Sequence, residues 1–153
     1  MELVSILMAL ASIVNAAPSA QPPVANKPAT TAKATGSTVK LRDSRYGRIL
    51  VTGKGLTLYL FTKESTPKPR CYGDCAKAWP PFYTKGKPKV GAGLDPRKVG
   101  ASKRSDGRRQ VTYNGHPLYR YFTEKKPGDI FCQNVAEFGG TWLVVARTGD
   151  AVR

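Results

Sequence analysis

The stretch VTGKGLTLYLFTKE (Val51–Glu64) recurs sixty residues later as VTYNGHPLYRYFTE (Val111–Glu124). Each copy has two runs of strand-forming residues around a short turn, at Gly53–Gly55 in the first copy and at Asn114–Gly115 in the second. Asn-Gly between two strands is typical of a tight hairpin, because both turn residues need a positive φ. The sequence therefore predicts a fold that is built from two pseudo-repeated β-hairpin halves.

The composition favours a small, mostly β single domain. The chain has 153 residues, 41% of them hydrophobic, and its 15 Gly and 12 Pro disfavour long helices. We expect one short helical turn at Asp74–Trp79, because the two prolines that follow cannot continue a helix. The compact apolar run Thr141–Ala146 predicts a buried closing strand. The other predicted strands are Ile49–Thr52, Leu56–Thr62, Val99–Lys103, Gln110–Tyr113 and His116–Phe122.

The first forty residues predict a leader and a linker ahead of a domain at 41–153. Leu3–Val14 is an apolar run of about a dozen residues, whereas a membrane-spanning helix needs about 20. Small residues follow this run, which is typical of a secretory signal peptide (1–16) that is cleaved after Ala16. The alternatives are a frayed apolar tail and a short anchor. Residues 17–40 are rich in Ala, Pro, Thr and Lys, so we expect a disordered linker and a secreted or periplasmic mature protein.

The three cysteines and the single histidine are the candidate redox or metal residues. Cys71 and Cys75 have three residues between them, which on a helical turn places their α-carbons about 6 Å apart, within disulfide reach. In an exported protein a disulfide is favoured over a soft-metal or redox pair. Cys132 pairs with one of these two, pairs with another chain, or stays buried as a small apolar residue. His116 is a weak metal candidate, with Cys132 or Glu124 as companions, and a solvent-facing strand position is the favoured alternative.

Two aromatic pairs and two carboxylates occupy matching positions in the repeat. Side chains alternate across a strand, so the two aromatic residues of each pair share one face, and we favour core packing over ligand stacking. Two carboxylates face to face could act as acid and base on a glycosidic bond, but hydrogen bonding to loop N–H groups is favoured. No Gly-x-Ser-x-Gly motif is present, so no catalytic constellation is recognisable. The matching positions are Tyr59, Phe61 and Glu64 in the first copy, and Tyr119, Tyr121 and Glu124 in the second.

Several short blocks occur in a recognisable order between Tyr46 and Ala146. They include Gly47–Val51, Cys71–Pro81, Gln110–Gly115, Lys126–Asp129 and Gly139–Trp142. In these blocks the chain resembles the secreted-repeat predicted lipoproteins, bacterial envelope proteins with a Tyr-x-aromatic-x-x-Asp motif and a largely unknown function. The resemblance implies an envelope protein and no particular activity. This chain departs from the family in having Glu for the terminal Asp, no lipid-attachment cysteine, and Phe131–Asn134 in place of a glycine-rich stretch.

The positive charge of the chain is concentrated in one segment. The formal net charge is +15, and residues 85–109 hold nine basic residues against Asp95 and Asp106. Gathered on one face, such residues would attract a polyanion such as an anionic envelope polymer, lipid head groups or nucleic acid. No motif for sequence-specific nucleic-acid recognition is present, and a basic surface that only keeps the protein soluble is the alternative. The candidate residues are Lys85, Lys87, Lys89, Arg97, Lys98, Lys103, Arg104, Arg108 and Arg109.

Two functions from different classes follow from these observations. The first is an exported, non-enzymatic cell-envelope module, binding or structural, with a basic face for an anionic partner and no cofactor. The second is an extracytoplasmic redox or metal-binding protein that uses Cys71, Cys75, Cys132 and His116.

Overall fold

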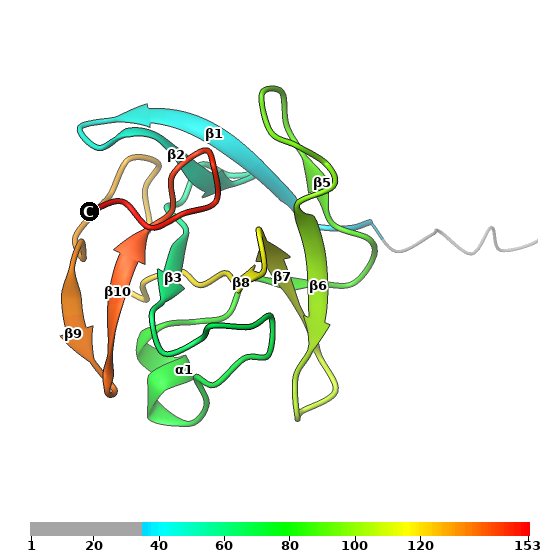
Figure 1. The fold of residues 1–153 in the computed structure, drawn as a ribbon, viewed down its shortest axis with the longest axis vertical. Helices are drawn as coiled ribbons and strands as arrows, with labels where there is room; N and C mark the ends of the chain where they lie inside the picture. The colour runs from blue at the N-terminus through cyan, green and yellow to red at the C-terminus, as the bar shows by residue number, and fades with distance from the viewer. Residues whose placement is uncertain (1–34) are drawn as a thin grey trace, which may run out of the picture. The chain divides into compact units, whose positions relative to one another are not determined.

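The computed structural model describes residues 35–153. The predicted signal peptide (1–16) and most of the predicted linker (17–40) therefore lie outside the described residues. Within 35–153 the chain forms ten short strands and one helix, α1 (Asp74–Ala78), arranged as three small sheets (Figure 1). The mostly β fold with one short helical turn is confirmed.

Two of the sheets are built in the same way, each around one hairpin. In each of them an antiparallel pair of longer strands is extended by a two-residue strand from elsewhere in the chain. The first sheet has the order β2 (Gly47–Thr52), β1 (Thr38–Ser44), β5 (Lys89–Val90); the other has the order β4 (Tyr83–Thr84), β7 (Arg109–Tyr113), β6 (Val99–Lys103), with β8 (His116–Pro117) also paired to β7.

The remaining sheet joins the two halves. Its central strand is β10 (Gly140–Val144), which pairs antiparallel with β3 (Tyr59–Phe61) on one side and with β9 (Val135–Glu137) on the other. In Figure 1 this sheet lies on the opposite side of the domain from β5 and β6. Because β3 belongs to the first half and β10 to the second, this pairing holds the halves together.

The two halves differ by one residue at their turns. Asn114 and Gly115 have φ values of 50° and 78°, as the predicted Asn-Gly hairpin requires. The bridge before this turn pairs Thr112 with Pro117, whereas the matching bridge in the first half pairs Val51 with Thr57. The first turn is therefore one residue longer than the second. Before the turn, Val51 occupies the place of Thr112 in the other half, and not that of Val111, as a constant offset of sixty residues would give.

The chain crosses between the halves a second time. Tyr83, at the end of the first half, pairs with Gln110 in β7, and Ala146, at the end of the second half, bridges Ile49 in β2. The last segment of each half thus pairs with a strand of the other half. The two repeats are interleaved, so neither has a core of its own.

Several predicted boundaries are wrong. The linker does not reach Lys40, because β1 begins at Thr38 and Val39 is fully buried in the core. Only three residues of the predicted strand Leu56–Thr62 form β3, and His116–Phe122 is reduced to the two residues of β8. The two segments meet at Tyr59 and Tyr119, which exchange backbone hydrogen bonds of 2.9 and 3.0 Å.

The close packing of β10 on β3 predicts the effect of a single methyl group. A Cβ at Gly140 would lie 2.4 Å from the Phe61 ring, so Gly140→Ala forces a shift of packed atoms and should lower the free energy of unfolding by about 1–3 kcal/mol. Urea unfolding followed by tryptophan fluorescence measures this change. In the control variant Gly53→Ala the nearest atom is Thr38 Cβ at 3.5 Å, an ordinary contact; an equal loss in both variants would contradict the steric explanation.

Candidate functional site

The paired motif residues meet across the two halves. Tyr59 donates a 2.5 Å hydrogen bond from its hydroxyl to Glu124 Oε1, and Tyr119 donates one of 2.6 Å to Glu64 Oε1. The tyrosine of each copy is therefore bound to the glutamate of the other copy. Tyr59 and Tyr119 are fully buried, so these bonds satisfy polar atoms that water cannot reach.

Each glutamate also holds the loop that follows it. Glu64 Oε1 accepts a hydrogen bond of 2.6 Å from the backbone N–H of Arg70, and Glu124 Oε1 accepts one of 2.8 Å from that of Phe131. The carboxyl group thus links the tyrosine of one half to a loop of its own half. Both glutamates therefore accept hydrogen bonds from loop N–H groups, which is the role that the sequence favours over acid–base catalysis.

Burial sets the protonation of this centre. Desolvation raises the pKa of the Glu64 and Glu124 carboxyls above their usual 4.5, although the tyrosine and backbone donors act in the opposite direction. Burial and the facing carboxyl raise the pKa of both tyrosines far above 10. The second carboxyl oxygen of each glutamate is buried without a hydrogen-bond partner among the described residues, which favours the neutral acid.

Catalysis by the two carboxyl groups has no support in this geometry. Glu64 is 2% exposed and Glu124 is 3% exposed. Each is held by a tyrosine hydroxyl and a backbone N–H, so a glycosidic oxygen has no access to either in this structure. Their arrangement stabilises the fold instead.

Four aromatic rings stack through the middle of the domain. Trp79 and Trp142 lie parallel with ring centroids 4.1 Å apart, Phe61 stacks on Trp142 at 4.2 Å, and Tyr121 packs at 4.8 Å against Trp79. The Tyr59 ring meets Trp79 edge-on. The rings of the two halves alternate along this stack. The aromatic pairs thus pack in the core, as the sequence predicts.

The cysteines form one disulfide and one thiol. Cys71 and Cys75 are joined by a disulfide with their α-carbons 5.3 Å apart, which confirms the favoured pairing. Cys132 is a free, buried cysteine, and burial raises the pKa of its thiol. His116 is half-buried on β8. No group of three metal-ligating side chains occurs between residues 35 and 153.

The nine basic candidates occupy different environments. Arg104 is 3% exposed, and its guanidinium donates to Gln110 Oε1 and to the Cys71 carbonyl. It therefore belongs to the interior, which corrects its placement on a surface face. Arg97 is exposed but paired with Asp95 at 2.8 Å, and Lys98 donates to a backbone carbonyl. The exposed candidates without an ion pair among the described residues are Lys85, Lys87, Lys89, Lys103 and Arg109.

A hollow of about 670 Å³ brings three of the basic residues together. Lys85, Arg108 and Arg109 line it, along with Tyr83 and several hydroxyl-bearing side chains. Thr84 pairs with Arg109 across β4 and β7, which places the neighbouring Lys85 beside these arginines. Arg108 lies over the Tyr83 ring, 4.1 Å from its centroid, and is fixed by a 2.8 Å ion pair with Asp106. This is a site where cations converge around an open cavity.

The comparisons with known proteins identify the repeat. A family model described as a secreted repeat of unknown function matches the chain twice, at residues 40–83 and 100–146. The chain belongs to this secreted repeat family. Neither the curated proteins nor the solved structures gave a match. The two matched ranges are the two interleaved halves, so the resemblance in the sequence is confirmed.

Between residues 35 and 153 no helix is long and apolar enough to cross a membrane.

The crossed hydrogen bonds of the secreted repeat can be tested by double-mutant cycles. We expect Tyr59→Phe and Glu124→Met to be coupled by about 1 kcal/mol, because each change removes the same hydrogen bond: phenylalanine lacks the donor and methionine lacks the acceptor oxygen. Tyr119 and Glu64 should be coupled to a similar extent. The matched control is Tyr59→Phe with Glu64→Met, two residues of one copy, for which urea unfolding should give coupling near zero. Stronger coupling within a copy than between copies would contradict the crossed pairing.

The raised carboxyl pKa values predict a domain that is more stable at mildly acidic pH. The folded carboxyls keep their protons to a higher pH than the unfolded ones, so unfolding releases protons in this window and stability falls as the pH rises. The fall begins near the unfolded value of 4.5 and ends above the folded pKa. Urea unfolding at a series of pH values should show it, and the Glu64→Gln/Glu124→Gln variant should lack it. A stability that rises with pH from 4.5 upward, or an unchanged slope in the variant, would refute this assignment.

Proposed function

We propose that this secreted repeat protein is an exported, non-enzymatic binding module of the cell envelope that holds an anionic partner on its basic face. Cleavage after Ala16 and a periplasmic or extracellular site of action are part of the proposal. The observation that carries it is the convergence of Lys85, Arg108 and Arg109 on one cavity. Cations that converge on a hollow attract an anion more strongly than the same charges scattered over a surface.

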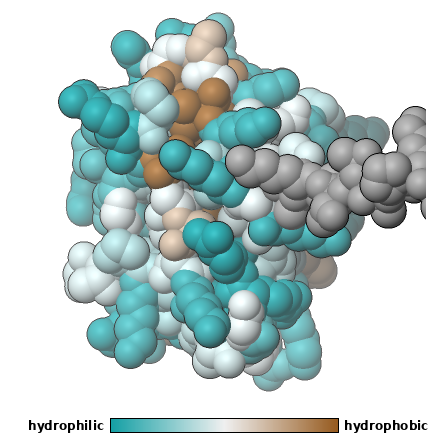
Figure 2. All heavy atoms as spheres, turned by 90° about the vertical axis from the view of Figure 1, so that its right-hand side faces the viewer, coloured by the Kyte–Doolittle hydropathy of each residue, from teal (hydrophilic) through white to brown (hydrophobic). Residues whose placement is uncertain are grey.

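The fixed orientation of Arg108 favours a binding role for the basic face over a role in solubility alone. Arg108 is oriented by Asp106 and by the Tyr83 ring, so less conformational entropy is lost when it meets an anion. Lys85 and Arg109 have no ion pair among the described residues and keep their full charge for a partner. Figure 2 shows that the face of the domain near β5 and β6 is mostly hydrophilic, with a smaller apolar patch.

The buried centres of the molecule serve this function indirectly. The Tyr–Glu pairs, the ring stack and the disulfide are all interior features. They make a stiff body on which surface side chains keep fixed positions. A binding module needs this, because preorganised groups lose less entropy on association.

The proposal predicts a specific response to charge reversal. The variant Lys85→Glu/Arg109→Glu should elute from a phosphocellulose column at a lower salt concentration than the unmodified protein. The matched control is Lys125→Glu/Lys126→Glu, which changes the net charge equally on exposed residues outside the hollow. Equal shifts in the two variants would show that net charge alone governs retention, and the proposed face would be refuted.

A further inference from the structure

Three separate hollows of the surface meet at one residue, Tyr83. The cationic hollow described above shares Ser37 and Tyr83 with a second hollow of about 410 Å³, and it shares Tyr83 and Arg108 with a third of about 340 Å³. The second and third also have Pro81 and Tyr83 in common. The three hollows therefore adjoin one another at Tyr83, and together we call them the Tyr83 track.

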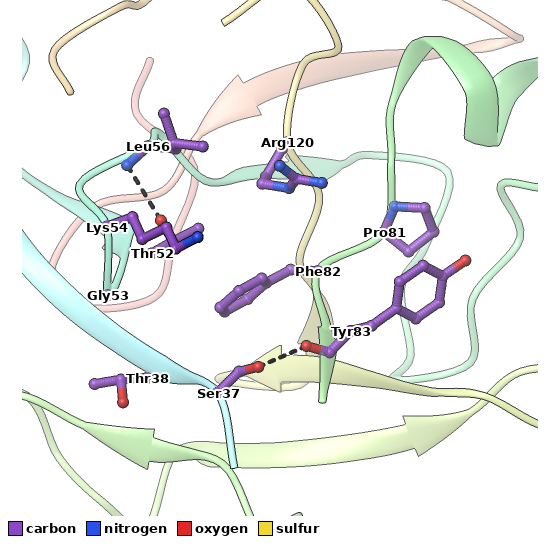
Figure 3. A pocket seen from close by; sticks show the side chains of 10 residues that line it. All are labelled: Ser37, Thr38, Thr52, Gly53, Lys54, Leu56, Pro81, Phe82, Tyr83 and Arg120. Atoms are coloured by element: carbon purple, nitrogen blue, oxygen red, sulfur yellow. Dashed lines mark hydrogen bonds between the residues drawn. The ribbon is translucent and has the colours of Figure 1, made fainter. Parts of the chain in front are cut away.

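The second hollow differs in chemistry from the cationic one. Phe82, Leu56 and Pro81 give it an apolar lining, and Figure 3 shows the Phe82 ring pointing into the space below Arg120 and beside Lys54. Neither Lys54 nor Arg120 has an ion pair among residues 35–153. This hollow thus offers a flat apolar ring together with two free cations.

Hydroxyl groups complete the lining between the two hollows. Ser37, Thr38 and Thr52 line the second hollow, and Ser37 also lines the cationic one. Ser37 donates a 2.7 Å hydrogen bond to the Tyr83 carbonyl, which fixes the wall where the hollows meet (Figure 3). A ligand that spans the second and the cationic hollows therefore meets an apolar lining, hydroxyl groups and two sets of cations. The cations are Lys54 and Arg120 in the second hollow, and Lys85 and Arg109 in the cationic one.

We propose that the Tyr83 track binds a linear polysaccharide of uronic acids. The proposal rests on the function proposed above and names the chemical class of its anionic partner. Each sugar ring of such a chain has an apolar C–H face for Phe82, hydroxyls for the serine and threonine side chains, and a carboxylate for a lysine or arginine. The second hollow offers all three features together, and the cationic hollow beside it offers hydroxyls and cations to the next sugars of the chain.

Other polyanions match this lining less well. Inorganic polyphosphate has no apolar surface, so it would leave Phe82 and Leu56 without a partner next to a desolvated charge. Single-stranded nucleic acid needs several open aromatic faces for successive bases. The track provides three aromatic residues, Phe82, Tyr83 and Tyr72, and an arginine covers one face of each tyrosine ring.

The test compares four polymers on the full mature chain by titration calorimetry at one salt concentration. The polymers are polygalacturonate, neutral dextran, inorganic polyphosphate and single-stranded oligothymidine. We expect polygalacturonate to bind about tenfold more tightly than polyphosphate and oligothymidine, and dextran not to bind. Lys54→Glu/Arg120→Glu should weaken polygalacturonate about tenfold or more, whereas Lys125→Glu/Lys126→Glu should weaken it much less.

Phe82→Leu tests the apolar contact separately from charge. Leucine keeps most of the volume, so the fold should survive, but it lacks the flat ring. The variant should bind polygalacturonate about tenfold less tightly and polyphosphate unchanged. Phe131→Leu, which alters a 61% exposed phenylalanine outside the three hollows, is the matched control.

The outcomes separate this inference from the proposed function. Equal binding of all three polyanions, with no effect of Phe82→Leu, would overturn the polysaccharide assignment and leave the basic face standing. Tightest binding of oligothymidine would overturn it in favour of nucleic acid. If none of the polyanions binds, both the inference and the proposed function fail.

Discussion

The fold depends on two hydrogen bonds that cross between its halves. A buried phenol is costly without a partner, and here the tyrosine of each repeat donates to a glutamate of the other repeat, as Tyr59 does to Glu124. The tryptophans obey the same constraint, because Trp79 and Trp142 complete one stack from opposite halves. Packing and hydrogen bonding therefore form together, and each half supplies what the other lacks.

The local features were predictable from the sequence because they depend on neighbours along the chain. The Asn114–Gly115 turn, the helical turn at Asp74 and the disulfide of Cys71 with Cys75 are all set by short spacings. The crossed pairs were not predictable, since Tyr59 and Glu64 are only five residues apart and nothing in that spacing points to a distant partner. β1 was missed because its polar residues resemble the linker, although Val39 is buried.

The candidate site was predictable in outline only. The run of basic residues indicated an anionic partner, but a count of charges treats Arg104 and Arg109 alike. The structure separates them, since the Cys71 carbonyl and Gln110 hold Arg104 inside while Arg109 stays exposed. Tyr83, where the three hollows meet, carried no signal in the sequence, because its importance comes from segments that the fold brings to it.

The interleaving of the repeats bears on how such a protein could arise. A single repeat made as a separate chain would lack a partner for its tyrosine and its tryptophan, and it would be stable only when two copies associate. Its folding would then depend on its concentration. Covalent fusion of two copies removes that dependence, because the second copy is always present at a high effective concentration. A dilute environment outside the cell is where this gain matters most.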